Sequence, residues 1–182
     1  MNKIRPEDQP GFEFKPGEYE SPGMQRTQRE LTERAIELLG ITSGKVLDVG
    51  CGTGLSSLVL KEHGFEVAGI DSSKEMADKA RERGIDAYLA DMHDVPLNTG
   101  YFDAIVSIST IQWSRKPKEL AREFSRLLKP NGRVVAQFYP GSEKAAVEVC
   151  KGFASTGFVG GLQVDNPKSP KRKRFFLVMQ KQ

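Results

Sequence analysis

A glycine-rich run followed by two spaced acids is the feature of this sequence best suited to holding a ligand. Residues 46–54 read Val-Leu-Asp-Val-Gly-Cys-Gly-Thr-Gly, which places three glycines behind a short apolar stretch. Glycine lets the backbone turn sharply and lets a ligand approach the chain closely. Asp71 and Asp91 each follow a further apolar stretch, where a carboxylate can accept hydrogen bonds from ribose hydroxyls or an adenine amino group. Together these residues predict a site for a cofactor with an adenosine part.

Helices and strands are expected to alternate around these residues and to bring them to one edge of a sheet. We expect strands at 46–49, 65–70, 85–90, 102–108, 133–139, 158–164 and 175–179. We expect helices at 21–39, 55–63, 117–128 and 142–154, a helix that opens on the capping-box pattern 72–75 and closes at Gly84, and a turn at 130–132. Ligands of such sheets bind at the carboxyl ends of the parallel strands. The link between the last two strands is too short for a crossover helix, so we expect that pair to be antiparallel.

The composition indicates a single globular domain. The chain has 182 residues, of which 38% are hydrophobic and 28% are charged, with a net charge of +3. We assign residues 1–20 to a flexible N-terminal arm and residues 21–182 to one domain. No apolar run approaches the roughly 20 residues of a membrane helix, so we expect no membrane contact and a cytoplasmic location. Cys51 and Cys150 are too few for a disulfide framework or a four-ligand zinc site, and we predict no metal site.

The spacing of the glycines distinguishes two cofactors. A nicotinamide dinucleotide site follows the pattern GxGxxG, but position 55 is Leu55 and the third glycine is Gly54. The GxGxG spacing and the Leu-Asp run before it resemble the class I methyltransferase family, whose cofactor is S-adenosylmethionine (SAM). The resemblance implies a Rossmann-like α/β fold with a seven-stranded, mostly parallel sheet in the order 3-2-1-4-5-7-6, whose last strand is antiparallel. The predicted cofactor-binding residues are Asp48, Gly50, Cys51, Gly52, Gly54, Asp71, Ser72, Asp91, Met92 and Ser107.

Class I enzymes place acceptor-binding residues after the fourth strand, which here is the stretch 107–113. That stretch lacks the Asn/Asp-Pro-Pro-Tyr/Phe turn typical of amine and amide methylation, and neither cysteine lies where carbon-5 methylation of a pyrimidine needs a nucleophile. Hydroxyl methylation needs a base, but we expect His63 at a helix end and His93 in a solvated loop. Guanine N7 is already nucleophilic and needs no base. Trp113 can stack on a purine, and Gln112 can hydrogen-bond its edge.

Three segments resemble the eukaryotic small-subunit ribosomal RNA guanine-N7 methyltransferase family. They are 107–113, 136–140 and 157–167, and the likeness covers nearly the whole folded chain. The resemblance implies a guanine in ribosomal RNA as acceptor and a role in ribosome assembly. It implies a pocket in which we assign Gln112, Trp113 and Tyr139 to catalysis and Phe138 to substrate binding. It also implies a small zinc-binding activator protein that extends the sheet beside the edge strand 86–90.

The basic run Lys168–Arg174 holds five cations and no acid. Lys171, Arg172 and Lys173 are therefore candidate phosphate contacts, provided that the run lies beside the acceptor site. The chain is shorter than the eukaryotic enzymes, which suggests an archaeal relative. Two alternatives stay open: methylation of a small molecule or a protein, which the scaffold alone allows, and a SAM-binding ribosome-assembly factor with little catalysis.

Overall fold

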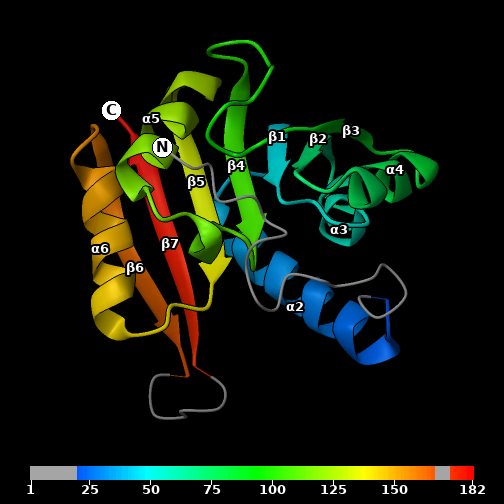
Figure 1. Ribbon diagram of the computed structural model, residues 1–182, viewed down its shortest axis with the longest axis horizontal. Coiled ribbons are helices and arrows are strands. Elements are labelled where there is room, and N and C mark those ends of the chain that lie inside the picture. The colour runs from blue at the N-terminus through cyan, green and yellow to red at the C-terminus, as the bar shows by residue number, and fades with distance from the viewer. Residues whose placement is uncertain (1–19, 167–172) are drawn as a thin grey trace.

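A seven-stranded sheet in the order β3-β2-β1-β4-β5-β7-β6 forms the centre of the computed structural model, which describes residues 20–166 and 173–182 (Figure 1). The strands are β1 (Gly44–Val49), β2 (Phe65–Asp71), β3 (Asp86–Leu89), β4 (Phe102–Ile108), β5 (Leu128–Phe138), β6 (Phe158–Asp165) and β7 (Arg174–Lys181). The helices are α2 (Pro22–Leu39), α3 (Leu55–Glu62), α4 (Lys74–Glu82), the short 3₁₀ turn η2 (Ile111–Trp113), α5 (Pro117–Leu127) and α6 (Glu143–Ala154). The order and the α/β class confirm the predicted class I methyltransferase fold.

The direction of each strand also agrees with the prediction. Strands β1, β2, β3, β4 and β5 pair in parallel, whereas β7 is antiparallel to both β5 and β6. The carboxyl ends of the parallel strands therefore meet at one edge of the sheet, where the glycine loop and the predicted acids follow them. The described chain has no helix that combines the length and the apolar character needed to span a bilayer.

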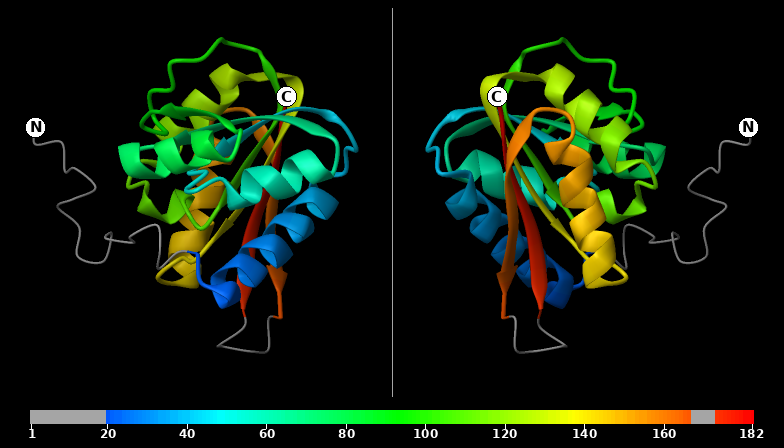
Figure 2. Two further views of the ribbon diagram at one scale, coloured as in Figure 1. Left: turned by 90° about the vertical axis from the view of Figure 1, so that its right-hand side faces the viewer. Right: turned by 90° about the vertical axis from the view of Figure 1, so that its left-hand side faces the viewer.

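Two layers of helices cover the sheet, as its edge-on views show (Figure 2). On one face, apolar residues of α2 and α3, such as Leu31 and Leu60, pack against Val46 and Val106 of the central strands. On the other face, residues of α5 and α6 pack against Leu47 and Ile105. Because β1 and β4 are covered on both faces, their sequences are nearly continuous apolar runs, as buried parallel strands require. The two layers hold the strand ends rigidly beneath the site.

Two helix ends follow local chemistry in the sequence. Helix α2 begins after Ser21, whose hydroxyl accepts a hydrogen bond from the N–H of Met24, and it ends at Gly40 in the left-handed conformation. Helix α4 begins one residue later than the capping-box pattern predicts. Ser73, and not Ser72, is its N-cap and accepts the N–H of Met76.

The predicted turn at 130–132 lies inside β5 and does not precede it. The strand already pairs at Leu128 with Phe102, and pairing resumes at Arg133 with Ala104. The residues between these pairs bulge out of the ladder, and Asn131 takes the left-handed conformation with φ 62°. Buried Leu128 anchors the chain before the bulge, so the strand is longer than its apolar run predicts.

Candidate active site

The glycine loop after β1 is shaped by backbone conformations that favour glycine. Gly50, Gly52 and Gly54 have φ values of 74°, 54° and 89°, all in the left-handed region. The N–H groups of Gly50 and Cys51 both donate to the carbonyl of Ile70 at the end of β2, at 2.8 and 3.0 Å. The loop is therefore fastened to the neighbouring strand end, and its turn depends on the absence of side chains.

Gly50 also permits a close approach between two segments of the site. A Cβ atom at position 50 would lie 2.1 Å from Oγ1 of Thr110, which follows β4. This distance is far inside van der Waals contact. The glycine therefore decides how closely the cofactor loop lies to the segment that leads to Trp113.

Asp71 ties the glycine loop to the beginning of α4. Its Oδ2 accepts the N–H of Gly52 at 2.9 Å, and its Oδ1 accepts the N–H of Ser73 at 2.9 Å. Burial raises the pKa of Asp71, while hydrogen bonds from backbone N–H groups oppose that rise. A carboxylate offers about four acceptor positions, so both oxygens retain capacity for ribose hydroxyls. The exposed Ser72 adds a backbone hydrogen bond to the same carboxylate.

Asp48 lies fully buried at the end of β1. Its Oδ2 accepts the hydroxyls of Ser56 and Ser57 at 2.6 Å each, whereas Oδ1 has no hydrogen-bond partner within the described residues. Burial raises the pKa of Asp48 to about 6, despite the two serine hydrogen bonds. A buried carboxylate with an unpaired oxygen is costly by itself, and a cationic ligand at this loop would offset that cost. SAM carries such a charge, so the residues present fit the predicted cofactor.

Cys51 and Ser107 support the cofactor loop from inside the protein. Cys51 is buried, burial raises the pKa of its thiol, and a Cβ at Gly69 of β2 would lie 2.8 Å from its sulfur. Ser107 is fully buried and donates to the carbonyl of Val49 at 2.8 Å, which joins β4 to β1. Both were predicted to bind the cofactor, and the structure places their side chains in the scaffold beneath it.

Asp91 and Met92 follow β3, as predicted for the adenine side of the site. The N–H of Ala90 donates to the carbonyl of Asp71 at 3.0 Å, which places the two acids on adjoining segments. Met92 is half-buried and packs against the main core. Asp91 keeps a side chain that is 70% exposed, and its Oδ1 accepts hydrogen bonds from the backbone and the ring of His93, at 2.8 Å each.

His93 lies in the predicted loop, but its side chain is less solvated than that prediction implies. Its side chain is only 25% exposed. Nδ1 lies 2.8 Å from Oδ1 of Asp91, and Nε2 lies 2.8 Å from Oγ of Ser114. Sequence reasoning missed this residue because its second partner lies 21 positions along the chain.

Ser109 is the centre of a hydrogen-bond network in the segment predicted to bind the acceptor. This residue has φ 57°, which is unusual for a non-glycine residue. Its N–H donates to the carbonyl of Gln137, its hydroxyl donates to Oε1 of the same residue, and its carbonyl accepts Nε2 of Gln112. Oε1 of Gln112 and Nε2 of Gln137 are buried without a hydrogen-bond partner in the described structure. Gln112 and Gln137 therefore both bond to Ser109, and within the described structure Gln112 keeps an unpaired acceptor while Gln137 keeps an unpaired donor.

The structure brings Gln112 and Trp113 together on η2 but separates the two aromatics after β5. Trp113 is half-buried. Tyr139 is 50% exposed, whereas Phe138 is fully buried and its ring lies 6.3 Å from that of Phe175. Phe138 was predicted to bind the substrate, and this placement assigns it to the core instead. Phe138 is the last residue of β5, whereas Tyr139 lies beyond the end of the strand.

The basic run is only partly described. Lys171 and Arg172 lie outside the described residues, as does nearly all of the predicted arm 1–20. Lys173 pairs with Glu143 of α6 and lies 5.2 Å from the centre of the Phe175 ring. Its ammonium group is therefore shared between an acid and an aromatic face. Gln137 was not among the predicted site residues, although it begins the Gln-Phe-Tyr-Pro segment that pointed to this strand end.

Comparisons with known proteins identify a methyltransferase domain in this chain. A model of the methyltransferase domain matches residues 47–136. The 18S rRNA (guanine-N(7))-methyltransferase of Schizosaccharomyces pombe is 37% identical over 173 residues, which cover 86% of this chain and 65% of the relative. The corresponding Bos taurus enzyme is 39% identical over 169 residues, covering 84% of this chain and 60% of the relative. The chain thus spans slightly less than two thirds of these relatives.

Among solved structures, a methyltransferase in complex with the Trm112 methyltransferase activator of Haloferax volcanii shares the fold. Its TM-score is 0.66 at 20% sequence identity, over 79% of this chain and 72% of that chain. The sheet order, the glycine loop, the matched domain and the rRNA-modifying relatives lead to the same conclusion. This chain carries a methyltransferase domain on the class I fold, and SAM is its cofactor.

Proposed function

We propose that the protein transfers the methyl group of SAM to N7 of a guanine in small-subunit ribosomal RNA. One observation carries the proposal: half-buried Trp113 directly follows Gln112, whose Oε1 is buried and unpaired within the described structure. A guanine offers a broad face for stacking and N–H donors on the edge away from N7. The named activity of the relatives, which match 84% to 86% of this chain, supports the same acceptor.

The main task of the protein in this reaction is to position the guanine and the cofactor relative to each other. Bound SAM supplies an electrophilic methyl group on a cationic sulfur. Guanine N7 would take the methyl group with its lone pair while the bond from that methyl to sulfur breaks and neutral S-adenosylhomocysteine leaves, so no proton is lost and no general base is needed. Asp71 and Asp91 hold the adenosine part, while Trp113 and Gln112 hold the base in line with the methyl group. His93 has both ring nitrogens engaged, which favours an acceptor of this kind over a hydroxyl.

Binding of RNA involves the basic run in this proposal. Cations that contact phosphates release counterions, so they raise affinity and steepen its dependence on salt. Replacing Lys171 and Arg172 by Ala should weaken RNA binding and flatten the plot of log affinity against log salt concentration by about two units. An unchanged slope would exclude the basic run from the RNA site.

An activator protein is the proposed partner at the β3 edge. This strand is only four residues long, and Leu89 at its end is 52% exposed. A partner that adds a strand there would pair its backbone groups and cover Leu89. The Haloferax volcanii methyltransferase of similar fold was solved with such an activator. Leu89→Asp should therefore abolish co-purification with a co-expressed activator and leave SAM binding within about twofold.

The deciding experiment is transfer of labelled methyl from SAM to small ribosomal subunits of host cells that lack the protein. Label recovered as 7-methylguanosine is the expected result. Label in another nucleoside would reject the proposed base, and label only in a protein or metabolite fraction would reject RNA as the acceptor. Asp71→Ala is the matched inactive control. If it still restored ribosome production in those cells, the assembly role without catalysis would replace the proposal.

A further inference from the structure

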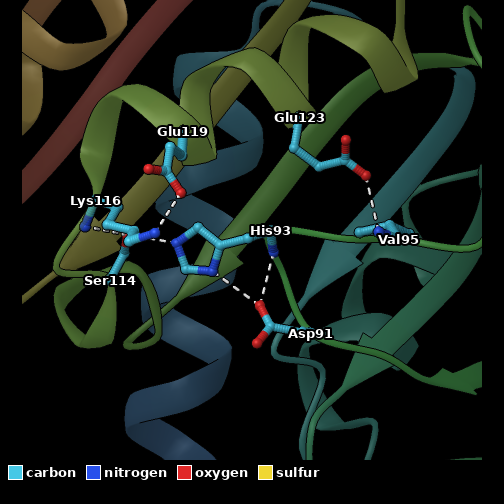
Figure 3. A network of polar contacts seen from close by, with 7 residues as sticks. All are labelled: Asp91, His93, Val95, Ser114, Lys116, Glu119 and Glu123. Atoms are coloured by element: carbon cyan, nitrogen blue, oxygen red, sulfur yellow. Dashed lines mark hydrogen bonds and ion pairs between the residues drawn. The ribbon is translucent and has the colours of Figure 1, made fainter. Parts of the chain in front are cut away.

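We infer that His93 is a positioning residue that clamps the adenine side of the site to the acceptor side, so that cofactor binding sets the position of Trp113. The inference rests on the proposed roles of Asp91 and Trp113. Figure 3 shows the His93 ring between Asp91, which follows β3, and Ser114, which follows η2. The ring therefore joins the segment after β3 to the segment after η2.

One tautomer of His93 satisfies every hydrogen bond of the clamp, which consists of Asp91, His93 and Ser114. A carboxylate only accepts, so Nδ1–H of His93 donates to Oδ1 of Asp91 at 2.8 Å. Nε2 then accepts the hydroxyl hydrogen of Ser114 at 2.8 Å, and Oγ of Ser114 accepts the N–H of Lys116 at 3.2 Å. Each bond fixes the direction of the next. The chain of bonds thus runs from a cofactor-binding carboxylate to the residue that directly follows Trp113.

The same order of side chains activates serine in hydrolases, where the acid is buried. Here the side chain of Asp91 is 70% exposed, and Oγ of Ser114 is engaged by a backbone N–H. The geometry therefore favours a clamp over a nucleophile. The far part of the loop after β3 is held separately, because the N–H of Val95 donates to Glu123 and Arg126 donates to the Val95 carbonyl, at 2.8 and 2.7 Å. His93 holds the part of the loop beside Asp91.

The clamp predicts coupling between the two halves of the site. When adenosine engages Asp91, the His93 ring and Ser114 are held with it, and Trp113 is ordered before the acceptor arrives. Removing the clamp should leave SAM affinity nearly intact but raise the acceptor KM. Losing one or two hydrogen bonds corresponds to about a tenfold change. Coupling is reciprocal, so acceptor binding should tighten SAM in the wild type by the same factor.

Trp113 makes this measurable without any methyl transfer, because it is the only tryptophan in the chain. The experiment titrates S-adenosylhomocysteine into wild type, His93→Asn and Ser114→Ala while recording tryptophan emission and acrylamide quenching. Both variants should bind the ligand within about threefold of wild type, lose most of the ligand-induced emission change, and leave Trp113 about twice as accessible to acrylamide. The double variant should add nothing, as expected for two residues in one interaction.

His63→Asn is the matched control, because it makes the same substitution at the chain's other histidine. That ring bonds locally to the Val59 carbonyl at 2.8 Å, and its loss should leave Trp113 emission unchanged. A wild-type emission response in His93→Asn would overturn the clamp. So would a variant whose ligand affinity and emission response fall in parallel while Ser114→Ala behaves as wild type, because His93 would then serve Asp91 alone. If the variants lose the ligand-induced emission change but the wild-type protein methylates no RNA, the proposed function would be rejected and the clamp would stand.

Discussion

The predicted cofactor side and the predicted acceptor side of the site are held in place by different kinds of interaction. On the cofactor side, residues 48–54 and 71–73 are held by backbone hydrogen bonds, left-handed glycines and a carboxylate that binds two N–H groups. On the acceptor side, residues 107–113 and 137–139 are held by side-chain amides and hydroxyls that meet at Ser109. We therefore expect substitutions that alter the backbone conformation to disrupt the cofactor side. On the acceptor side, we expect the identity of the side chains to decide which acceptor binds. This difference shows how one scaffold keeps its cofactor while its acceptor varies among relatives.

The largest effect is expected from Gly50→Ala, which tests how rigid the cofactor side is. The new Cβ would lie 2.1 Å from Thr110 Oγ1 on a backbone with φ 74°. We expect a loss of well over 3 kcal/mol, combining strain and displacement of the loop, with SAM binding reduced more than about 100-fold in calorimetry.

Gly84→Ala is a matched control for that substitution. Gly84 has φ 76°, nearly the value at Gly50, but no atom lies within 4 Å of an added Cβ. It should therefore cost only about 1–2 kcal/mol of unfolding free energy and leave SAM affinity unchanged. Equal losses at both positions would mean that backbone conformation alone, and not the contact with Thr110, shapes the loop.

An intermediate effect is expected from Asp48→Asn, measured as unfolding free energy against pH without ligand. The folded-state pKa of Asp48 is about 6 against an ordinary 3.8, so the folded state binds this proton more tightly than the unfolded state. Ionisation therefore lowers wild-type stability as pH rises from 4 to 7. The variant lacks this loss, so its stability relative to wild type should improve by up to about 3 kcal/mol over that range.

The same measurement of unfolding free energy against pH, repeated with saturating SAM, tests whether the bound cation changes the ionisation of Asp48. A bound cation favours the ionised carboxylate, so the pH dependence in wild type should flatten while that of Asp48→Asn stays the same. A difference between the two proteins that is constant from pH 4 to 7 would contradict the raised pKa.

The smallest effect is expected from Trp113→Ala, which tests whether the acceptor side can fail alone. Stacking of a base on an aromatic ring contributes about 1–3 kcal/mol, so kcat/KM for the RNA should fall roughly 30-fold, while calorimetry shows SAM affinity within about threefold. Trp113→Phe should recover part of the activity because it keeps an aromatic face. A parallel loss of SAM affinity and turnover would show that Trp113 supports the fold and that the two sides are not separable.

Much of this protein follows from its sequence because the relevant physics is local. The spacing of Gly50, Gly52 and Gly54 does not fit the dinucleotide pattern, and its resemblance to the class I methyltransferase loop implied SAM. The antiparallel last pair followed from a connection too short for a crossover helix, whereas the strand order was implied by the resemblance to class I methyltransferases. Short-range patterns of this kind are readable without knowing what packs against them.

The tertiary structure alone decided which side chains are available for chemistry. His93 became a clamp because Ser114, 21 positions away, lies within 2.8 Å of its ring. Phe138 and Tyr139 are adjacent aromatics in the sequence, yet one is fully buried and the other is 50% exposed, because β5 ends at Phe138, which packs in the core, and Tyr139 lies beyond the strand. Oε1 of Gln137 bonds to Ser109, 28 positions away, which leaves Nε2 of the same amide without a partner in the described structure. Burial and pairing of this kind are set by residues distant in the chain, and no local pattern records them.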